Sequence, residues 1–269
     1  MTVSIVVDGR DITVERGTML LQAARRAGFD IPALCHHDGL APYGACRLCL
    51  VEVSRGGRAR ITTACNYPVL HAGEMVSTDS EGVKRARRVV MELLLARCPD
   101  SKPVRDLARS IGVEQSRFPT PTPSRLPRGE AALTDCVLCG LCVRACEEAI
   151  GASAISFSDR GSNRRVATPF FVNTEACTGC GACAAVCPTG IIRLEDGAGT
   201  RRLAFLNIEV TMARCARCGA SFGAGPQIDR LRTTVPAVEE SLALCPACRR
   251  REAGARLARE GARRAEAPR

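Results

Sequence analysis

The pattern of apolar and polar residues at the start of the chain predicts strands arranged around one helix. The segments TVSIVVDG and RDITVE alternate apolar and polar positions on either side of Asp8–Gly9, as the two strands of a hairpin do. Thr18 is placed to cap an amphipathic helix, MLLQAARRAG, and Gly28 to end it. A second hairpin is expected in CRLCLVEVSRGGRARITTAC, turning at Gly56–Gly57. A hairpin, a helix, a cysteine loop and a further hairpin form the order of a β-grasp fold.

After the second hairpin the pattern changes to that of helices. Residues 82–117 have helical periodicity, with a break expected at Pro99 and Pro103. Prolines alternate from Pro119 to Gly129, which predicts a stiff linker. Further on, a short inserted hairpin is expected to turn near Gly161. The last twenty residues alternate Arg, Ala and Glu, which is typical of a solvated helix or a frayed tail.

Cysteine is the residue type that changes this picture most. Of the 269 residues 46% are apolar, but only 3% are aromatic and none is Trp, so large rings supply little buried area. Sixteen of the 17 cysteines fall into four groups of four, and Cys98 is left over. No secretory signal opens the chain, and no apolar run approaches the roughly 18 residues of a membrane span. We therefore expect a cytoplasmic chain whose reduced thiols bind metal and do not form disulfides.

The first group has the spacing of a [2Fe–2S] site. Its members are Cys35, Cys46, Cys49 and Cys65, separated by ten, two and fifteen residues. Three ligands lie close together and the fourth returns from a distance, as in plant-type [2Fe–2S] sites, although the first interval is longer than theirs. Gly39 and Gly44 suit a loop that turns tightly around inorganic sulfide. His36 and His37 adjoin Cys35, but four cysteines already complete the site, so we expect neither ring to be a ligand.

The second and third groups follow the rule of two-cluster ferredoxins. The motifs are CVLCGLCVRAC and CTGCGACAAVCP, each with C-x2-C-x2-C-x3-C spacing, in which the fourth cysteine ligates the other cluster. One [4Fe–4S] cluster is therefore assigned to Cys136, Cys139, Cys142 and Cys187. The other is assigned to Cys177, Cys180, Cys183 and Cys146. Gly140, Gly179 and Gly181 suit a close approach of the backbone to the clusters.

Two segments carry a resemblance to a known family. LCHHDGLAPYGACRLCLVEV resembles the [2Fe–2S] domain that opens the large electron-transfer subunit of respiratory complex I, and the matching small subunit of NAD-linked hydrogenases and formate dehydrogenases. CVRACEEAIGASAISFSDRG resembles the same family, with Glu147 where a ferredoxin has proline. The resemblance implies an iron–sulfur (diaphorase) subunit.

The chain departs from that family in its middle segment. Relatives usually hold a further [4Fe–4S] cluster there with one histidine and three cysteines. This chain offers only Cys98, and no histidine follows His71. We expect that cluster to be absent and Cys98 to be a buried apolar thiol. Either the [2Fe–2S] centre then passes electrons directly to the pair of [4Fe–4S] clusters, or a partner protein bridges the two.

The fourth group consists of two Cys-x-x-Cys pairs separated by 26 residues: Cys215, Cys218, Cys245 and Cys248. This is the spacing of a tetrahedral tetrathiolate site, and Gly219 allows the tight turn around a metal. Structural zinc is the first choice, and a rubredoxin-like single iron is the rival.

The formal charge of +10 overstates how basic the loaded protein is. A four-thiolate cluster or zinc site carries about −2, so four such sites leave roughly +2. Few aromatic residues accompany the arginine clusters, so base stacking is poorly supplied. A nucleic-acid-binding redox sensor is the least favoured interpretation.

The sequence therefore predicts an electron relay of the α+β class with one [2Fe–2S] cluster, two [4Fe–4S] clusters and one zinc or mononuclear iron. No GxGxxG turn, P-loop or Ser/His/Asp arrangement is present, so the chain is expected to be a non-catalytic subunit. We expect it to carry electrons between a flavoprotein that oxidises NAD(P)H and a redox catalytic subunit, such as a hydrogenase or formate dehydrogenase, in a soluble hetero-oligomer. The alternative is a relay in a membrane-associated, quinone-linked or ion-pumping complex.

The expected division of the chain has five parts. A β-grasp [2Fe–2S] domain is followed by a helical segment with its linker, a two-[4Fe–4S] domain, a four-cysteine zinc-ribbon or rubredoxin-like domain and a basic tail. Their bounds are 1–80, 81–129, 130–205, 206–250 and 251–269.

Overall fold

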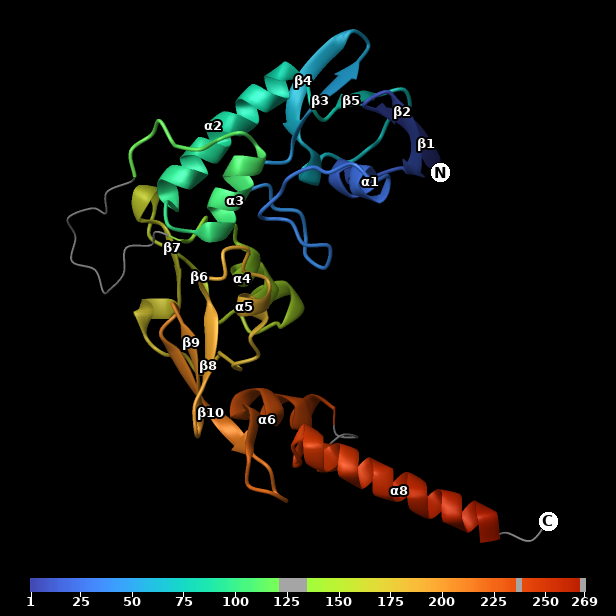
Figure 1. The fold of residues 1–269 in the computed structure, drawn as a ribbon, viewed down its shortest axis with the longest axis vertical. Helices are drawn as coiled ribbons and strands as arrows, with labels where there is room; N and C mark the ends of the chain where they lie inside the picture. The colour runs from blue at the N-terminus through green and yellow to red at the C-terminus, as the bar shows by residue number, and fades with distance from the viewer. Residues whose placement is uncertain (121–134, 236–238, 267–269) are drawn as a thin grey trace.

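The structure, a computed structural model, describes residues 1–120, 135–235 and 239–266. Figure 1 shows the chain as a series of units in sequence order, from an N-terminal sheet at one end to a projecting C-terminal helix at the other. The linker expected from Pro119 to Gly129 lies, from residue 121 onward, outside the described residues.

The N-terminal unit is a five-stranded sheet around one helix. The strands are β1 (Thr2–Val7), β2 (Arg10–Glu15), β3 (Leu50–Arg55), β4 (Arg58–Thr63) and β5 (Met75–Ser77), and the helix is α1 (Leu20–Arg26). The order is β2-β1-β5-β3-β4, with β1 and β5 parallel and the other pairs antiparallel. Leu20 and Leu21 of α1 are fully buried with Val7 and Val51 of the sheet. Both hairpins and the helix of the expected β-grasp are therefore confirmed.

The start of α1 differs from the prediction. Thr18 does not cap the helix: Met19 occupies the N-cap position in an extended conformation, and no side chain caps the first turn. The reason is that Met19 pairs with Pro68 as an isolated β-bridge, while the Thr18 carbonyl accepts a hydrogen bond from the Val69 N–H. Gly28 ends the helix as expected, with φ of +86° just beyond Ala27.

Two helices follow the sheet, α2 (Glu81–Arg97) and α3 (Lys102–Ser110). The Ser80 hydroxyl caps α2 by accepting a hydrogen bond from the Val83 N–H at 3.3 Å. The predicted break is confirmed, but Pro103 does not cause it, since that proline lies in the first turn of α3, where its missing N–H costs nothing.

The second cysteine unit combines short helices with a sheet. Its helical segments are α4 (Leu141–Arg144), a π-helical turn (Ala145–Ala149) and α5 (Ala182–Ala185). The inserted hairpin is β6 (Ser156–Ser158) and β7 (Arg165–Ala167), with a short helical turn (Gly161–Asn163) at its tip, and a further turn (Pro169–Phe171) follows it. The sheet order is β11-β10-β9-β8, formed by β8 (Arg193–Asp196), β9 (Thr200–Ala204), β10 (Ile208–Arg214) and β11 (Ser221–Ala224). This sheet continues across the expected boundary at residue 205, so the last two cysteine pairs are built onto the second unit.

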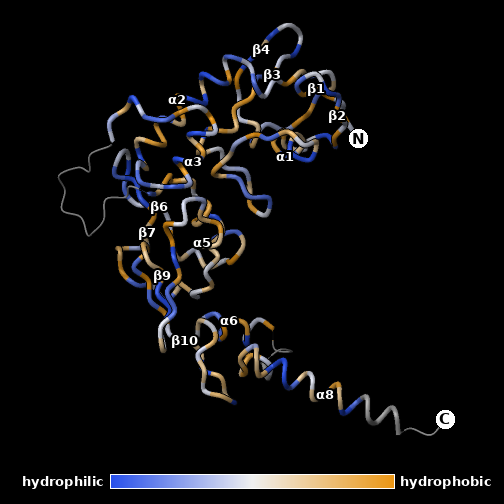
Figure 2. The backbone as a smooth tube through the Cα atoms, in the orientation of Figure 1, coloured by the Kyte–Doolittle hydropathy of each residue, from blue (hydrophilic) through white to orange (hydrophobic). Residues whose placement is uncertain are grey.

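The C-terminal part is helical: α6 (Gly225–Thr234), α7 (Glu239–Leu242) and α8 (Pro246–Glu266). Figure 1 shows α8 extending away from the rest of the chain. Figure 2 shows hydrophilic and hydrophobic positions interspersed along it, and Leu257 is 69% exposed. Within the described part of the chain, no helix is both long and apolar enough to cross a membrane.

Candidate iron–sulfur and metal centres

The first cysteine group is gathered at one end of the N-terminal sheet. Cys35 and Cys46 lie in the loop between α1 and β3, Cys49 lies directly before β3, and Cys65 lies in a short helical turn (Ala64–Asn66) after β4. None of the four is more than 4% exposed. Backbone N–H groups point at the sulfurs: that of Cys46 lies 3.4 Å from Cys35 Sγ, and that of Leu34 lies 3.4 Å from Cys46 Sγ.

These four thiols change one another's acidity. Hydrogen bonds from the Cys46 and Cys65 side chains lower the pKa of Cys35 to about 2. The Cys65 side chain lowers the pKa of Cys49 to about 7. The pKa values of Cys46 and Cys65 are raised in return, chiefly by their hydrogen bonds to Cys35. The contacts within the group therefore favour the thiolate, which is the form that binds iron, at Cys35 and Cys49.

Gly44 has a structural role in this loop. Its φ is +72°, and a Cβ placed on it would lie 2.7 Å from the Asn66 amide nitrogen, so a larger residue would displace Asn66 from beside Cys65. The two histidines have other contacts. His36 Nε2 lies 3.1 Å from the Asp38 carboxylate, and His37 Nδ1 lies 3.1 Å from the Gly39 N–H.

The second and third groups line two cavities, and each cavity takes cysteines from both motifs. The first is lined by Cys136, Cys139, Cys142 and Cys187, with apolar walls that include Val166, Ile192 and Phe205. The second is lined by Cys146, Cys177, Cys180 and Cys183, with Ile155, Leu203 and Ile208 among its walls. In each case three cysteines of one motif meet the fourth cysteine of the other.

The two cysteines that cross between the motifs receive hydrogen bonds at their sulfurs. Burial alone would raise the pKa of Cys187, but hydrogen bonds from Thr189, including its hydroxyl, and from the backbone of Ile191 and Ile192 lower it overall. The Ala154 N–H points at Cys146 Sγ from 3.3 Å. Donors aimed at sulfur favour the thiolate over the thiol.

The second cavity also depends on a close backbone approach. Gly179 has φ of +67°, and a Cβ on it would lie 2.5 Å from Val210 Cγ2 and 2.8 Å from Ala224 Cβ. Glycine is therefore needed where the Cys177–Cys183 loop packs on β10 and β11. Arg201, paired with Asp196, donates to the Gly179 carbonyl at 3.0 Å and fixes the same loop from the other side.

The fourth group is assembled at the end of β10, the start of β11 and the start of α8. The sulfurs of Cys215, Cys218, Cys245 and Cys248 all lie within 4.8 Å of one another. The Cys245 N–H donates to Cys215 Sγ at 3.3 Å, and this contact is the largest cause that lowers the pKa of Cys215 to about 6. Four converging thiols with N–H support fit one tetrahedral metal ion.

Cys98 is separate from these four groups. It is fully buried at the end of α2, within an apolar cluster that includes Met91, Leu95 and Val104. Burial raises the pKa of its thiol to about 12.

Two arginines contact the cysteine motifs and were not expected from the sequence. Arg97 donates to the Cys136 carbonyl, and Arg144, buried between Cys142 and Cys146, donates to the Cys35 carbonyl. The available signal for Arg144 was that it is the only charged residue inside CVLCGLCVRAC.

Comparison with protein families assigns domains to these regions. Residues 1–81 match the 2Fe-2S iron-sulfur cluster binding domain. Residues 135–191 and 170–221 match two families of 4Fe-4S dicluster domain.

Related proteins share the same part of the chain. NADPH-Fe(3+) oxidoreductase subunit alpha of Geobacter sulfurreducens is 36% identical over 204 residues, covering 71% of this chain and 24% of that protein. An NADH-quinone oxidoreductase subunit from Rhizobium meliloti is 32% identical over 206 residues, again covering 71% of this chain and 24% of that protein. The mitochondrial 78 kDa subunit of NADH-ubiquinone oxidoreductase from Candida albicans is 34% identical over 182 residues, covering 62% of this chain and 25% of that protein. The chain thus spans about a quarter of the length of these curated relatives.

Among solved structures, a chain of an NAD+-reducing [NiFe]-hydrogenase in the H2-reduced state matches with a TM-score of 0.52 and 31% identity, over 62% of this chain and 74% of that one. The protein therefore belongs to the family of iron–sulfur electron-transfer subunits found in NAD(P)H-linked oxidoreductases and hydrogenases, and it matches their [2Fe–2S] and [4Fe–4S] dicluster part.

Proposed function

We propose that this chain relays single electrons within a multi-subunit oxidoreductase. The observation that carries the proposal is the crossed lining of the two cavities, in which each motif supplies three cysteines to one cavity and its fourth cysteine to the other. This is the ligand pattern of two-cluster ferredoxins.

The proposed ligands are those expected from the spacing. Cys35, Cys46, Cys49 and Cys65 hold the [2Fe–2S] cluster. Cys136, Cys139, Cys142 and Cys187 hold one [4Fe–4S] cluster, and Cys177, Cys180, Cys183 and Cys146 hold the other. Such clusters take up and release single electrons without making bonds to a substrate. The residues of the chain bind them as thiolates, point N–H groups at their sulfurs and exclude water with apolar walls.

The packing supports a continuous order of sites. Cys35 and Cys46 share one apolar cluster with Cys139, whereas Cys142 and Cys183 belong to the next cluster along the chain. We propose that the [2Fe–2S] site adjoins the first [4Fe–4S] site and that the second [4Fe–4S] site is terminal. In this order the family's middle cluster is dispensable, and Cys98 only packs.

We propose structural zinc at the fourth group, with a single iron as the rival. The four sulfurs complete a tetrahedral set and leave no open position for a substrate. The group is joined to the second [4Fe–4S] site through β10 and β11, so the metal would hold these strands in place.

The partners we propose are a flavoprotein that oxidises NAD(P)H and a catalytic redox subunit, in a cytoplasmic complex. This is supported by the relative named as an NADPH-Fe(3+) oxidoreductase subunit and by the NAD+-reducing hydrogenase. The Rhizobium meliloti relative, named as part of an NADH-quinone oxidoreductase, supports the alternative, a quinone-linked complex at a membrane. Co-purification with membranes from the native host would favour the alternative, whereas recovery with a flavoprotein from the high-speed supernatant would favour the first proposal.

We assign a surface patch that precedes the motif CTGCGACAAVCP to the contact with a partner subunit. Phe170, Phe171 and Val172 are 91%, 46% and 58% exposed, in a chain in which only 3% of residues are aromatic. Both phenylalanines have positive φ, 55° and 62°, which is costly for an L-residue. Exposed aromatic side chains held on a strained turn are typical of anchors in protein interfaces.

Metal analysis combined with EPR of the anaerobically purified protein tests the proposal. We expect about 10 iron and one zinc per chain, with signals from one [2Fe–2S] and two [4Fe–4S] centres. About 14 iron would contradict the absence of the middle cluster, and about 11 iron without zinc would replace zinc by a mononuclear iron. A protein without a [2Fe–2S] signal under these conditions would overturn the relay.

A further inference from the structure

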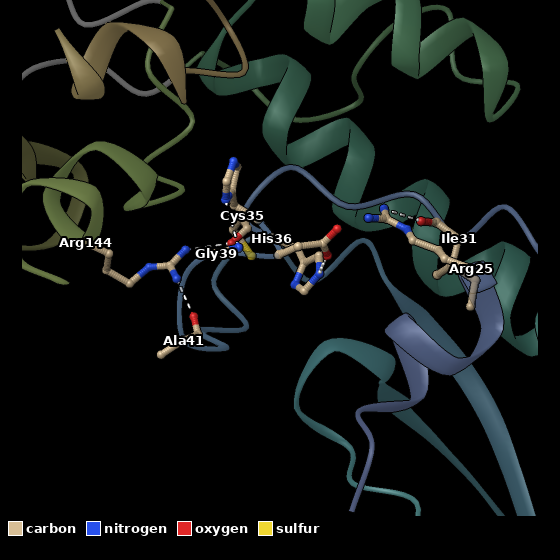
Figure 3. A network of polar contacts seen from close by, with 9 residues as sticks. Arg25, Ile31, Cys35, His36, Gly39, Ala41 and Arg144 are labelled. Carbon is tan, nitrogen blue, oxygen red and sulfur yellow. Dashed lines mark hydrogen bonds and ion pairs between the residues drawn. The ribbon is translucent and has the colours of Figure 1, made fainter. Parts of the chain in front are cut away.

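Ala41, in the loop between Cys35 and Cys46, is held from both sides of its backbone by residues of the second cysteine unit. Its carbonyl accepts a hydrogen bond from the guanidinium of Arg144, and its N–H donates to the carboxylate of Glu148 at 2.8 Å. A second nitrogen of Arg144 donates to the carbonyl of Cys35 at 2.8 Å. Figure 3 shows the Arg144 side chain reaching across to Cys35 and Ala41.

The π-helical turn places these two side chains. Arg144 ends α4, and Glu148 lies within Ala145–Ala149, four residues further along and on the same side of the helical segment. The turn is marked by the hydrogen bond from the Ile150 N–H to the Ala145 carbonyl. Such π turns are rare and often occur at functional sites. Cys146, the proposed crossing ligand of the second [4Fe–4S] site, lies in the same turn, so one short segment contacts the surroundings of all three proposed clusters.

The loop also packs on this segment through an aromatic ring. The Tyr43 ring lies 5.2 Å from the Arg144 guanidinium carbon, which is close enough for a cation–π interaction. The Tyr43 ring also lies 3.0 Å from the position that a Cβ on Gly140 would occupy. A side chain at Gly140 would therefore push the ring, and the loop with it, away from the first [4Fe–4S] motif.

The charge of Arg144 needs a partner that the polypeptide does not supply. Arg144 is only 8% exposed, its Nε has no hydrogen-bond partner, and within the described ranges no carboxylate makes an ion pair with it. A buried guanidinium without a counter-charge is expensive. The proposed cysteinate clusters on either side, each with a formal charge of about −2, would supply the missing negative charge.

We propose that Arg144 and Glu148 are positioning residues that clamp the [2Fe–2S] loop onto the ferredoxin unit, and that the fixed charge of Arg144 raises the reduction potential of the [2Fe–2S] site. The inference rests on the proposed function, because it assumes that the clusters are bound. Reduction adds one negative charge to the site, and a nearby cation stabilises the reduced form more than the oxidised form, so the potential rises.

The test uses the full chain, purified anaerobically with its clusters. The variants are Arg144→Met, Arg144→Lys and Glu148→Ala, with Glu147→Ala as the matched control. Glu147 is the neighbouring exposed acid and makes no side-chain hydrogen bond or ion pair within the part of the chain that the structure describes. Two properties are measured: the [2Fe–2S] midpoint potential, by EPR at controlled potentials, and the rate at which a chelator removes the [2Fe–2S] iron.

Arg144→Met should lower the midpoint potential of the [2Fe–2S] site by about 59 mV. For one electron, this shift corresponds to a change of about tenfold in the ratio of reduced to oxidised cluster at a fixed solution potential. Arg144→Lys keeps the positive charge but loses the forked guanidinium that donates to two carbonyls. The [2Fe–2S] midpoint potential of this variant should therefore stay near that of the wild type, while iron loss becomes faster. Glu148→Ala should also speed iron loss several-fold, and Glu147→Ala should not.

Arg144→Met with an unchanged potential would overturn the charge role. Equal rates of iron loss in Glu148→Ala and Glu147→Ala would overturn the clamp. If Arg144→Met does not fold, Arg144→Lys and Glu148→Ala still decide the clamp, and a potential for Arg144→Lys far below that of the wild type would overturn the charge role. A wild-type protein without a [2Fe–2S] signal would instead refute the proposed function, which keeps the two failures distinct.

Discussion

Arg97 donates a hydrogen bond from Nε to the carbonyl oxygen of Cys136 at 2.9 Å and so ties the end of α2 to the first cysteine of the [4Fe–4S] motifs. Its Nη2 donates to the carbonyl of Arg164 at 3.1 Å, in the inserted hairpin directly before β7. The middle segment, in which Cys98 is the only cysteine, thus still contributes by fixing the wall of the first cavity.

We expect Arg97→Met to loosen this wall without removing a ligand. The loss of two hydrogen bonds from a charged donor to partly buried carbonyls should cost about 2–3 kcal/mol of stability. The check is the midpoint of thermal unfolding of the cluster-loaded protein, followed by the visible absorption of the clusters. Arg85→Met, a change at an exposed position of α2, is the control and should leave the midpoint unchanged.

Cys98→Ala should leave the iron content unchanged, since Cys98 is buried among apolar residues and its thiol is held protonated by a pKa raised to about 12. In the wild type the same thiol should resist iodoacetamide at pH 8 until the protein is unfolded. Iron analysis and mass spectrometry of labelled peptides measure both. Loss of about 4 iron in Cys98→Ala would mean that Cys98 is a cluster ligand after all.

Cys187→Ser and Cys146→Ser form a reciprocal pair. Cys187 lines the cavity of Cys136, Cys139 and Cys142, whereas Cys146 lines the other cavity. We expect each variant to lose or alter the [4Fe–4S] signal of the opposite motif, as seen by EPR and by iron content. If Cys187→Ser instead affected only the cluster of its own motif, the crossed assignment would be wrong.

Gly179→Ala should destabilise the second [4Fe–4S] site, because the new methyl group would lie 2.5 Å from Val210 Cγ2 in a backbone with φ of +67°. Gly190 has the same φ of +67° but no atom within 4 Å of its Cβ position, so Gly190→Ala reports the backbone strain alone. We expect about 1 kcal/mol of destabilisation for Gly190→Ala and at least about 2 kcal/mol for Gly179→Ala. Equal unfolding midpoints for the two variants would show that the contact with β10 is not needed.

Phe170→Gly should not reduce stability, and relief of the positive φ should raise it by about 1 kcal/mol. If the patch is a partner contact, the variant should also recover less of the partner subunits in affinity purification from the native host. Leu257→Ser, at another exposed apolar position, is the control and should leave partner recovery unchanged. Unchanged partner recovery for Phe170→Gly would remove this surface from the proposed interface.

The spacing of the cysteines was enough to predict the domain classes, because ligand spacing is set by cluster chemistry and is local in sequence. The two hairpins and the break between α2 and α3 also followed from local patterns, since turn glycines and helix ends depend on neighbouring residues. The start of α1 did not follow. Thr18 is a good cap by sequence, but its carbonyl accepts a hydrogen bond from Val69, and Met19 beside it pairs with Pro68, about fifty residues away in the chain.

The sequence by itself therefore determined which residues can bind metal and in which groups. Only the tertiary structure showed that β8 to β11 join the last two cysteine pairs to the ferredoxin unit, and that Arg144 reaches Cys35. The physical reason is range. The ligands of one motif lie within a few residues of one another, so the sequence shows them directly. The contact of the buried Arg144 with the Cys35 loop joins residues more than one hundred positions apart, and it exists only when both are packed against the same core.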